Sequence, residues 1–157
     1  MKLDICDTAE QNMLKEMKKH IKNKEDINKR NNYGHVPLLL AIIRGHEEMA
    51  LLLLEHGADP TLKDNHGLNA LHISAQEQMN NVAKIIIGKS PESLYVECKH
   101  GAQPLWYAVH NAKRPFDIIK LFLEKGADKD HGENGSTAFD RAKDYNIDEV
   151  VALFDGY

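Results

Sequence analysis

Apolar residues along the chain fall into two kinds of short block that alternate with polar stretches. The first kind lies at 34–41, 67–74, 101–108 and 135–142. The second kind, at 49–54, 82–87 and 118–123, places apolar side chains at the spacing of one helix face. This pattern predicts units made of a turn, a short helix, a tight connection and a longer helix.

The units repeat with a nearly constant period. Each block of the first kind begins with a glycine. These glycines are Gly34, Gly67, Gly101 and Gly135, which are 33, 34 and 34 residues apart. Three residues after each glycine stands Pro or Ala, followed by a large apolar residue. Proline suits the first turn of a helix, where its missing N–H leaves no bond unmade. The register of four copies therefore predicts a stack of repeats.

Four short motifs carry a resemblance to a known family. Pro37-Leu38 and Leu71-His72 match its helix-start block, Gly45-His46 its tight turn, and Gly57-Ala58-Asp59 its helix exit. The chain resembles the ankyrin-repeat family over essentially its whole length. The resemblance implies an all-α solenoid of stacked helix-turn-helix units with short β-hairpin turns. It also implies that the His72 ring bonds nearby backbone and holds the turn.

We expect one domain over residues 1–157. Residues 1–30 lack the glycine block but keep one helix-like stretch, with Met13, Leu14, Met17 and Ile21 on one face. They are therefore interpreted as a half-repeat that caps the N-terminus, with lysines covering the face that has no neighbour. Repeats are expected at 31–63, 64–97 and 98–131, followed by a C-terminal capping repeat at 132–157. Leu71 and Leu105 are expected to be buried.

Composition and charge argue against a nucleic-acid-binding, membrane-spanning, secreted or disulfide-rich protein. The formal net charge of −4 argues against a general nucleic-acid binder. No apolar run approaches the ~20 residues that span a bilayer, and the N-terminus lacks the apolar stretch of a signal peptide. Cys6 and Cys98 are too few for a disulfide framework, which favours a reducing compartment. We expect a cytoplasmic monomer that binds neither nucleic acid nor membrane.

The charges are unevenly distributed. Residues 126–157 carry three Lys or Arg against eight Asp or Glu. An acidic end of this kind would favour a basic partner surface. The alternative, a solvated end that only aids solubility, is equally compatible with the sequence.

Enzyme and metal signatures are incomplete. Gly88-Lys89-Ser90 matches the end of a phosphate-binding loop, but Ala83 occupies the position of its first glycine. Cys98 and His100, with His131, form half of a zinc-ligand pattern, and the simpler interpretation is turn side chains in water. Asn134-Gly135 is a favoured turn pair. We therefore expect no enzyme, no metal and no cofactor.

The resemblance implies a non-enzymatic module that binds and masks or inhibits a partner protein, with a toxin-neutralising immunity protein as one setting. The alternatives are a metal-binding or enzymatic regulator that uses the histidine-rich turns, or a fragment of a larger scaffold. Partner contacts are expected on the concave face rather than on the convex side, where Glu47, Glu48, Lys84 and Lys120 lie. Tyr33 and Tyr145 are the strongest candidates because their positions are exposed, Tyr107 is expected in the core, and Trp106 suits either role. The predicted binding residues are Tyr33, His35, Arg44, Asn65, His66, Gln76, Glu77, Lys99, His100, Trp106, His110, Asn111, Glu133, Asn134, Asp144 and Tyr145.

Overall fold

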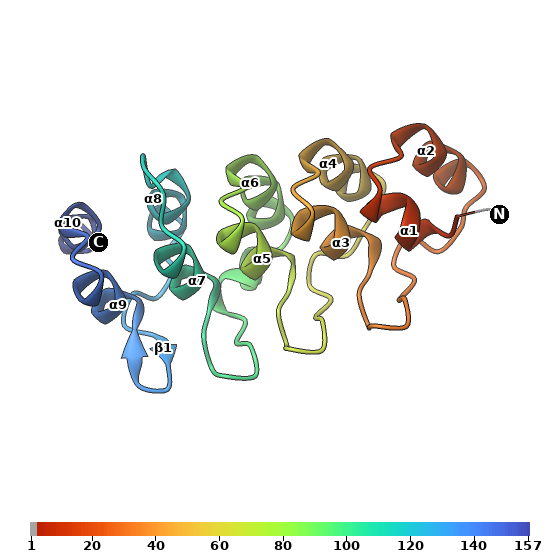
Figure 1. Cartoon of the computed structure of the whole chain (residues 1–157). Helices are drawn as coiled ribbons and strands as arrows, with labels where there is room; N and C mark the ends of the chain where they lie inside the picture. Colours follow the sequence, from red (N-terminus) through yellow and green to blue (C-terminus); the bar gives the residue numbers. More distant parts are fainter. Residues whose placement is uncertain (1–2) are drawn as a thin grey trace.

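The computed structural model describes residues 3–157 as a single row of helix pairs (Figure 1). We name the first helix of each pair inner and the second outer. The inner helices are α1 (Ile5–Glu10), α3 (Pro37–Ile43), α5 (Ala70–Gln76), α7 (Pro104–His110) and α9 (Ala138–Asp144). The outer helices are α2 (Leu14–Lys22), α4 (Glu47–Glu55), α6 (Asn80–Lys89), α8 (Asp117–Glu124) and α10 (Asp148–Asp155). A 3-10 helix, η1 (Pro91–Tyr95), follows α6, and the architecture confirms the predicted all-α solenoid.

The residues at the start of each inner helix explain why the helices begin in register. Proline opens α3 and α7, where no N–H is needed. The Asn69 side chain accepts from the backbone N–H of Leu71 at 3.1 Å and so caps α5. Thr137 Oγ1 accepts from the N–H of Asp140 at 3.0 Å and caps α9. These caps satisfy N–H groups that have no partner within the helix.

Most of the tight connections between paired helices share one backbone conformation. A residue with positive φ stands at the same place in four of the five pairs, and glycine fills it only at Gly45, where φ is 73°. Glutamine fills it at Gln78, whose side chain donates to the Ala75 carbonyl at 2.7 Å. Asparagine fills it in the first and last pairs, which suits a residue type that tolerates left-handed backbone.

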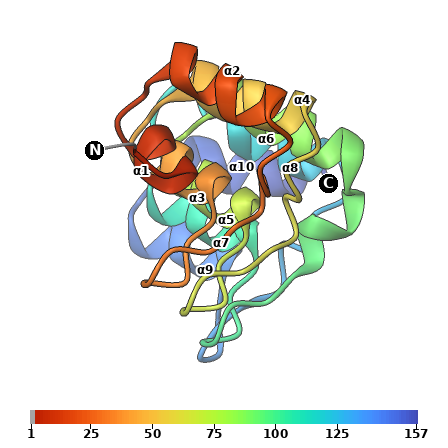
Figure 2. The same ribbon diagram turned by 90° about the vertical axis from the view of Figure 1, so that its right-hand side faces the viewer.

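The turns project together from one edge of the row, as the view along the stack shows (Figure 2). In residues 3–157 only the fourth turn forms paired strands, β1 (Gly132–Glu133) and β2 (Ser136–Thr137), with Gly132 opposite Thr137. Its loop residues Asn134 and Gly135 have φ values of 50° and 83°, as a type I′ hairpin turn requires. Each of the other turns is closed by two backbone hydrogen bonds, as when the Asp64 N–H donates to the Leu68 carbonyl at 2.9 Å and the Gly67 N–H to the Asp64 carbonyl at 3.1 Å.

The core lies between the inner and outer rows and runs the length of the stack. Each inner helix packs against the next inner helix, and each pair contacts the pairs beside it. Leu71 and Leu105 are 0% and 1% exposed, so their predicted burial is confirmed. No helix within residues 3–157 combines the length and apolar character needed to cross a membrane.

The N-terminal segment differs from the expectation drawn from its sequence. It contains a complete helix pair, α1 and α2, where the apolar pattern predicted one helix. Asp4 caps α1 by accepting from the Asp7 N–H at 2.9 Å, and Ile5, Cys6 and Ala9 are buried. The first unit therefore has both helices of a repeat and lacks only the glycine block that precedes the inner helix in the other units.

Candidate protein-binding surface

The inner helices and the turn tips together present one face, which we call the inner surface. Tyr33 is 75% exposed and Tyr145 42% exposed, in agreement with their predicted positions. Trp106 is buried at 6% exposure. His35, Asn111 and Glu133 are half-buried, and the remaining predicted residues are exposed, namely Arg44, Asn65, His66, Gln76, Glu77, Lys99, His100, His110, Asn134 and Asp144.

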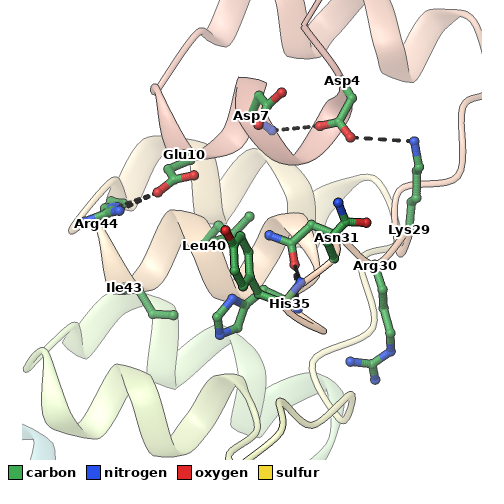
Figure 3. A pocket seen from close by; sticks show the side chains of 12 residues that line it. Asp4, Asp7, Glu10, Lys29, Arg30, Asn31, His35, Leu40, Ile43 and Arg44 are labelled. Atoms are coloured by element: carbon green, nitrogen blue, oxygen red, sulfur yellow. Dashed lines mark hydrogen bonds and ion pairs between the residues drawn. The ribbon is translucent and has the colours of Figure 1, made fainter.

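An open pocket of about 590 Å³ lies at the N-terminal end of the inner surface (Figure 3). Its opposite charges are largely paired with one another. Lys29 Nζ lies 3.6 Å from an Asp4 carboxylate oxygen, and Arg44 Nε donates to Glu10 at 3.0 Å. Tyr33 also lines the pocket. The lining has three acidic and three basic side chains, and two of each are in contact, so the pocket carries no net formal charge.

Direct bonds join neighbouring turns. Asn65 Nδ2 donates to the Tyr33 carbonyl at 2.9 Å, and the Lys99 N–H donates to the His66 carbonyl at 3.0 Å. A Cβ added at Gly34 would lie 2.6 Å from Asn65 Oδ1, so glycine permits the close approach of these two turns. Asn65 therefore holds the stack together as well as facing solvent.

A second line of contacts begins four residues before each turn glycine. Arg30 Nη1 donates to the Lys63 carbonyl at 2.8 Å, and Lys63 Nζ donates to the Glu97 carbonyl at 3.2 Å. Glu97 then lies 3.2 Å from His131, whose Nε2 also lies 2.8 Å from the Gly101 carbonyl oxygen. We call Arg30, Lys63, Glu97 and His131 the connecting row.

The interpretation of Cys98 as a turn side chain in water is wrong. Cys98 is 6% exposed and packs with Ala102 and Trp106, and the Tyr107 hydroxyl donates to its sulfur at 3.6 Å. Tyr107 is half-buried, and burial raises the pKa of its phenol. In the described part of the chain, no three His, Cys, Asp or Glu side chains are grouped as metal ligands would be.

His72 has the structural role that the resemblance implied. Its ring is fully buried, with Nε2 3.1 Å from the Ala102 carbonyl of the next unit. Its Nδ1 lies 3.3 Å from the Asn69 backbone N and 2.7 Å from Asn69 Oδ1, and Nε2 donates to Ala102 because a carbonyl oxygen can only accept. Burial lowers the pKa of His72 to about 4, so the ring is uncharged near neutral pH.

The densest group of interface-type side chains lies between the third and fourth turn-bearing units. We call Trp106, His110, Arg141 and Tyr145 the aromatic cluster. The rings of Trp106 and His110 stack with centroids 4.9 Å apart and an interplanar angle of 9°. The Arg141 guanidinium carbon lies 4.6 Å from the Trp106 ring centroid and 5.4 Å from that of Tyr145. Trp, Tyr and Arg are the residue types that dominate binding energy at protein interfaces.

Hydrogen bonds through the Tyr145 hydroxyl link Arg141 to His110. Arg141 Nη1 donates to the Tyr145 oxygen at 3.4 Å, and the Tyr145 hydroxyl lies 2.8 Å from His110 Nδ1. The binding residues predicted from the sequence include Trp106, His110 and Tyr145 but not Arg141. Spacing could have indicated Arg141, because it precedes Tyr145, the C-cap of α9, by four residues, as Trp106 precedes His110 on α7.

Comparison with known proteins agrees with this architecture. Residues 5–93 and 56–134 match the family model described as ankyrin repeats (3 copies). The chain is 31% identical over 103 residues to an ankyrin repeat protein of Acanthamoeba polyphaga mimivirus, covering 66% of this chain and 13% of the relative. It is 30% identical over 132 residues to the Saccharomyces cerevisiae protein named "Probable 26S proteasome regulatory subunit p28", covering 83% and 56%. It is 29% identical over 108 residues to the B-cell lymphoma 3 protein homolog of Mus musculus, covering 67% and 24%.

The chain thus spans between 13% and 56% of the length of these relatives. The similarity lies in the repeats, and proteins of this repeat family are generally non-enzymatic interaction modules. The match to the family model extends over most of the row of helix pairs. The chain belongs to the ankyrin-repeat family of protein–protein interaction modules.

Proposed function

We propose that this chain binds a partner protein through its inner surface and acts by masking the surface that it covers. Masking of this kind would inhibit a partner enzyme, or would neutralise a toxin if the chain is an immunity protein. The two cysteines are free and buried, which supports work in a reducing compartment, and we propose the cytoplasm. We further propose that the free protein is a monomer.

The observation that carries this proposal is the exposure of polar and aromatic side chains from successive units on one face. Tyr33, Gln76, His110 and Tyr145 come from four different inner helices and turns, and all are exposed. A face of this mixed character stays soluble when free yet offers hydrogen bonds and aromatic area to a partner. The outer helices instead expose mainly isolated charges, such as Glu48 and Lys84.

Charge at the C-terminal end supports a partner with a basic surface. Asp140 and Asp144 are exposed on α9, and Glu133 is half-buried in the adjoining turn. Asp140 is held by its contacts with Thr137, whereas Asp144 projects from the end of the inner helix. Acidic groups at the rim of an interface accelerate encounter with a basic partner, and salt weakens that effect.

The test is affinity capture by the immobilised protein from a lysate of the cells that produce it, with two double variants compared in parallel. The inner-surface variant carries Glu77→Lys and Asp144→Lys, and the outer-surface variant carries Glu48→Lys and Lys84→Glu. All four side chains are exposed, so both variants should keep the helical circular dichroism of the wild type.

A partner held by the wild type and by the outer-surface variant, but lost by the inner-surface variant, supports the proposal. Loss with the outer-surface variant alone would place the partner on the opposite face. Equal loss with both variants would indicate a partner that wraps around the stack, which also contradicts binding by the inner surface alone.

A further inference from the structure

Two buried N–H donors in the aromatic cluster have no hydrogen-bond partner. They are Nε1 of Trp106 and Nε of Arg141, both inaccessible to solvent and unpaired within residues 3–157. Trp106 as a whole is 6% exposed, so its indole N–H is held inside the surface layer. Buried donors in native proteins are nearly always paired, and an unpaired one calls for an explanation.

Comparison with the preceding repeat shows how the Trp106 donor loses its partner. His72 and Trp106 each stand five residues after their turn glycine. The His72 ring reaches the Ala102 carbonyl of the next turn at 3.1 Å. Trp106 forms no equivalent bond to the fourth turn and instead lies beneath the Arg141 guanidinium. Where the second repeat has a histidine that bonds to the next turn, the third repeat therefore has a tryptophan whose N–H has no acceptor in the described chain.

Arg141 carries a positive charge that no acid of the described chain neutralises. Its guanidinium contacts the Trp106 and Tyr145 rings and the Tyr145 hydroxyl, and it forms no ion pair. The adjacent Asp140 carboxylate accepts from Thr137 N at 3.0 Å and from Thr137 Oγ1 at 2.8 Å. By contrast, Arg44 and Arg114 each form an ion pair with a glutamate.

We infer that the aromatic cluster is the anchor for a single carboxylate, carried by an Asp or Glu side chain of the partner protein. This inference rests on the proposed function and specifies what the inner surface recognises. A carboxylate supplies the negative charge that Arg141 lacks, and guanidinium–carboxylate pairs are among the strongest hydrogen-bonded contacts. It would pair with the Nη groups of the half-buried guanidinium, because Trp106 Nε1 and Arg141 Nε are inaccessible in the free protein and become available only when the cluster side chains move on binding. Exposed Asp144 and half-buried Glu133 nearby favour basic residues on either side of that acid.

The experiment starts from a display selection of random 12-residue peptides against the wild-type protein. Binding of a selected peptide is then measured by the NMR signal of the indole N–H, which is unique because the chain has one tryptophan. Each peptide is compared with its own Glu→Gln or Asp→Asn version, a change that leaves the protein untouched. Arg141→Gln removes the cation of the cluster, and Lys143→Gln removes a cation from the same helix that lies over Phe139 instead.

The expected result is that selected peptides shift the indole signal through one acidic residue flanked by basic ones. Its amide replacement and Arg141→Gln should each weaken binding about tenfold or more, and the two together should do little further harm. Lys143→Gln should change binding less than about twofold.

Three results would overturn the inference. Peptides that bind through Tyr33 or Asp144 but are indifferent to Arg141 would leave the proposed function standing and remove the anchor. Inorganic phosphate or acetate that shifts the signal as strongly as the peptide would show a site for small anions. If every selected peptide binds the inner-surface variant as tightly as the wild type, both the inference and the proposed function are contradicted.

Discussion

Acidification should destabilise this protein through His72 in particular. The ring is fully buried and neutral, with its N–H directed at the Ala102 carbonyl, and burial lowers its pKa from 6.5 to about 4. In the unfolded chain the ring titrates near 6.5. Between these two pH values His72 is mostly protonated in the unfolded state and mostly neutral in the folded state. The stabilising contribution is therefore complete above about pH 6.5 and is lost as the pH falls toward about 4.

The magnitude follows from the difference between the two pKa values. Lowering the pH from about 7 to about 4 should remove roughly 3 kcal/mol of unfolding free energy through this one residue. His72→Gln cannot titrate in this range, although it leaves buried groups imperfectly bonded and should cost about 1–3 kcal/mol at neutral pH. The stability difference should therefore change by roughly 3 kcal/mol in favour of the variant on acidification, so that the variant equals or exceeds the wild type in stability near pH 4.

Urea unfolding followed by helical circular dichroism at several pH values gives the required free energies. His66→Gln is the matched control, because His66 is an exposed turn residue and its replacement should leave the pH dependence of stability unchanged. A wild-type and His72→Gln pair whose stability curves stay parallel from about pH 7 to about pH 4 would refute the reasoning. It would mean that the folded stack accepts the proton on His72 without penalty.

Three further predictions concern packing, backbone and thiol chemistry. Leu71→Ala or Leu105→Ala should cost about 2–5 kcal/mol in urea unfolding, and a loss below about 1 kcal/mol would show that the inner-helix core is not close-packed. Gly45→Ala should cost about 1–2 kcal/mol from its positive φ alone, since an added Cβ there meets no atom within 4 Å. Gly88→Ala, in the last turn of α6 and equally free of contacts, should instead stabilise by up to about 0.5 kcal/mol. Burial raises the pKa of the Cys6 thiol to about 11, so iodoacetamide should label it only after unfolding, as peptide mass spectrometry would show.

The sequence allowed most of the fold to be predicted because the repeats carry local signals. Glycine at the turn, Pro or Ala at the helix start and apolar residues at helical spacing all act within a few residues, and each recurs in register. The first helix, α1, carries none of these signals, and its few apolar residues are explained only by packing against α3. Burial of Cys98 likewise depends on Trp106 and Tyr107, which lie a full turn and helix start away.

The repeat positions indicated which side chains are exposed on the inner surface, but not the contacts within the cluster. Tyr33 and Tyr145 are exposed as their repeat positions indicate. The position of Arg141 corresponds to Leu40 and Ile73 in the other repeats, and both of those side chains are buried. Its role depends on a tryptophan from the preceding unit beneath it, and that contact arises only when the two units are stacked.

The connecting row has a consequence for how the repeats could be duplicated or exchanged. Arg30 and Lys63 each reach forward to a backbone carbonyl, which any following unit would supply whatever its sequence. Glu97 instead faces the side chain of His131, so this junction depends on the identity of the residue in the next unit. Copies of a repeat inserted after the first or second turn should therefore be accepted readily. At the last junction, a unit without a histidine at the position of His131 should cost up to about 1 kcal/mol, which is the contribution of a partly exposed side-chain pair.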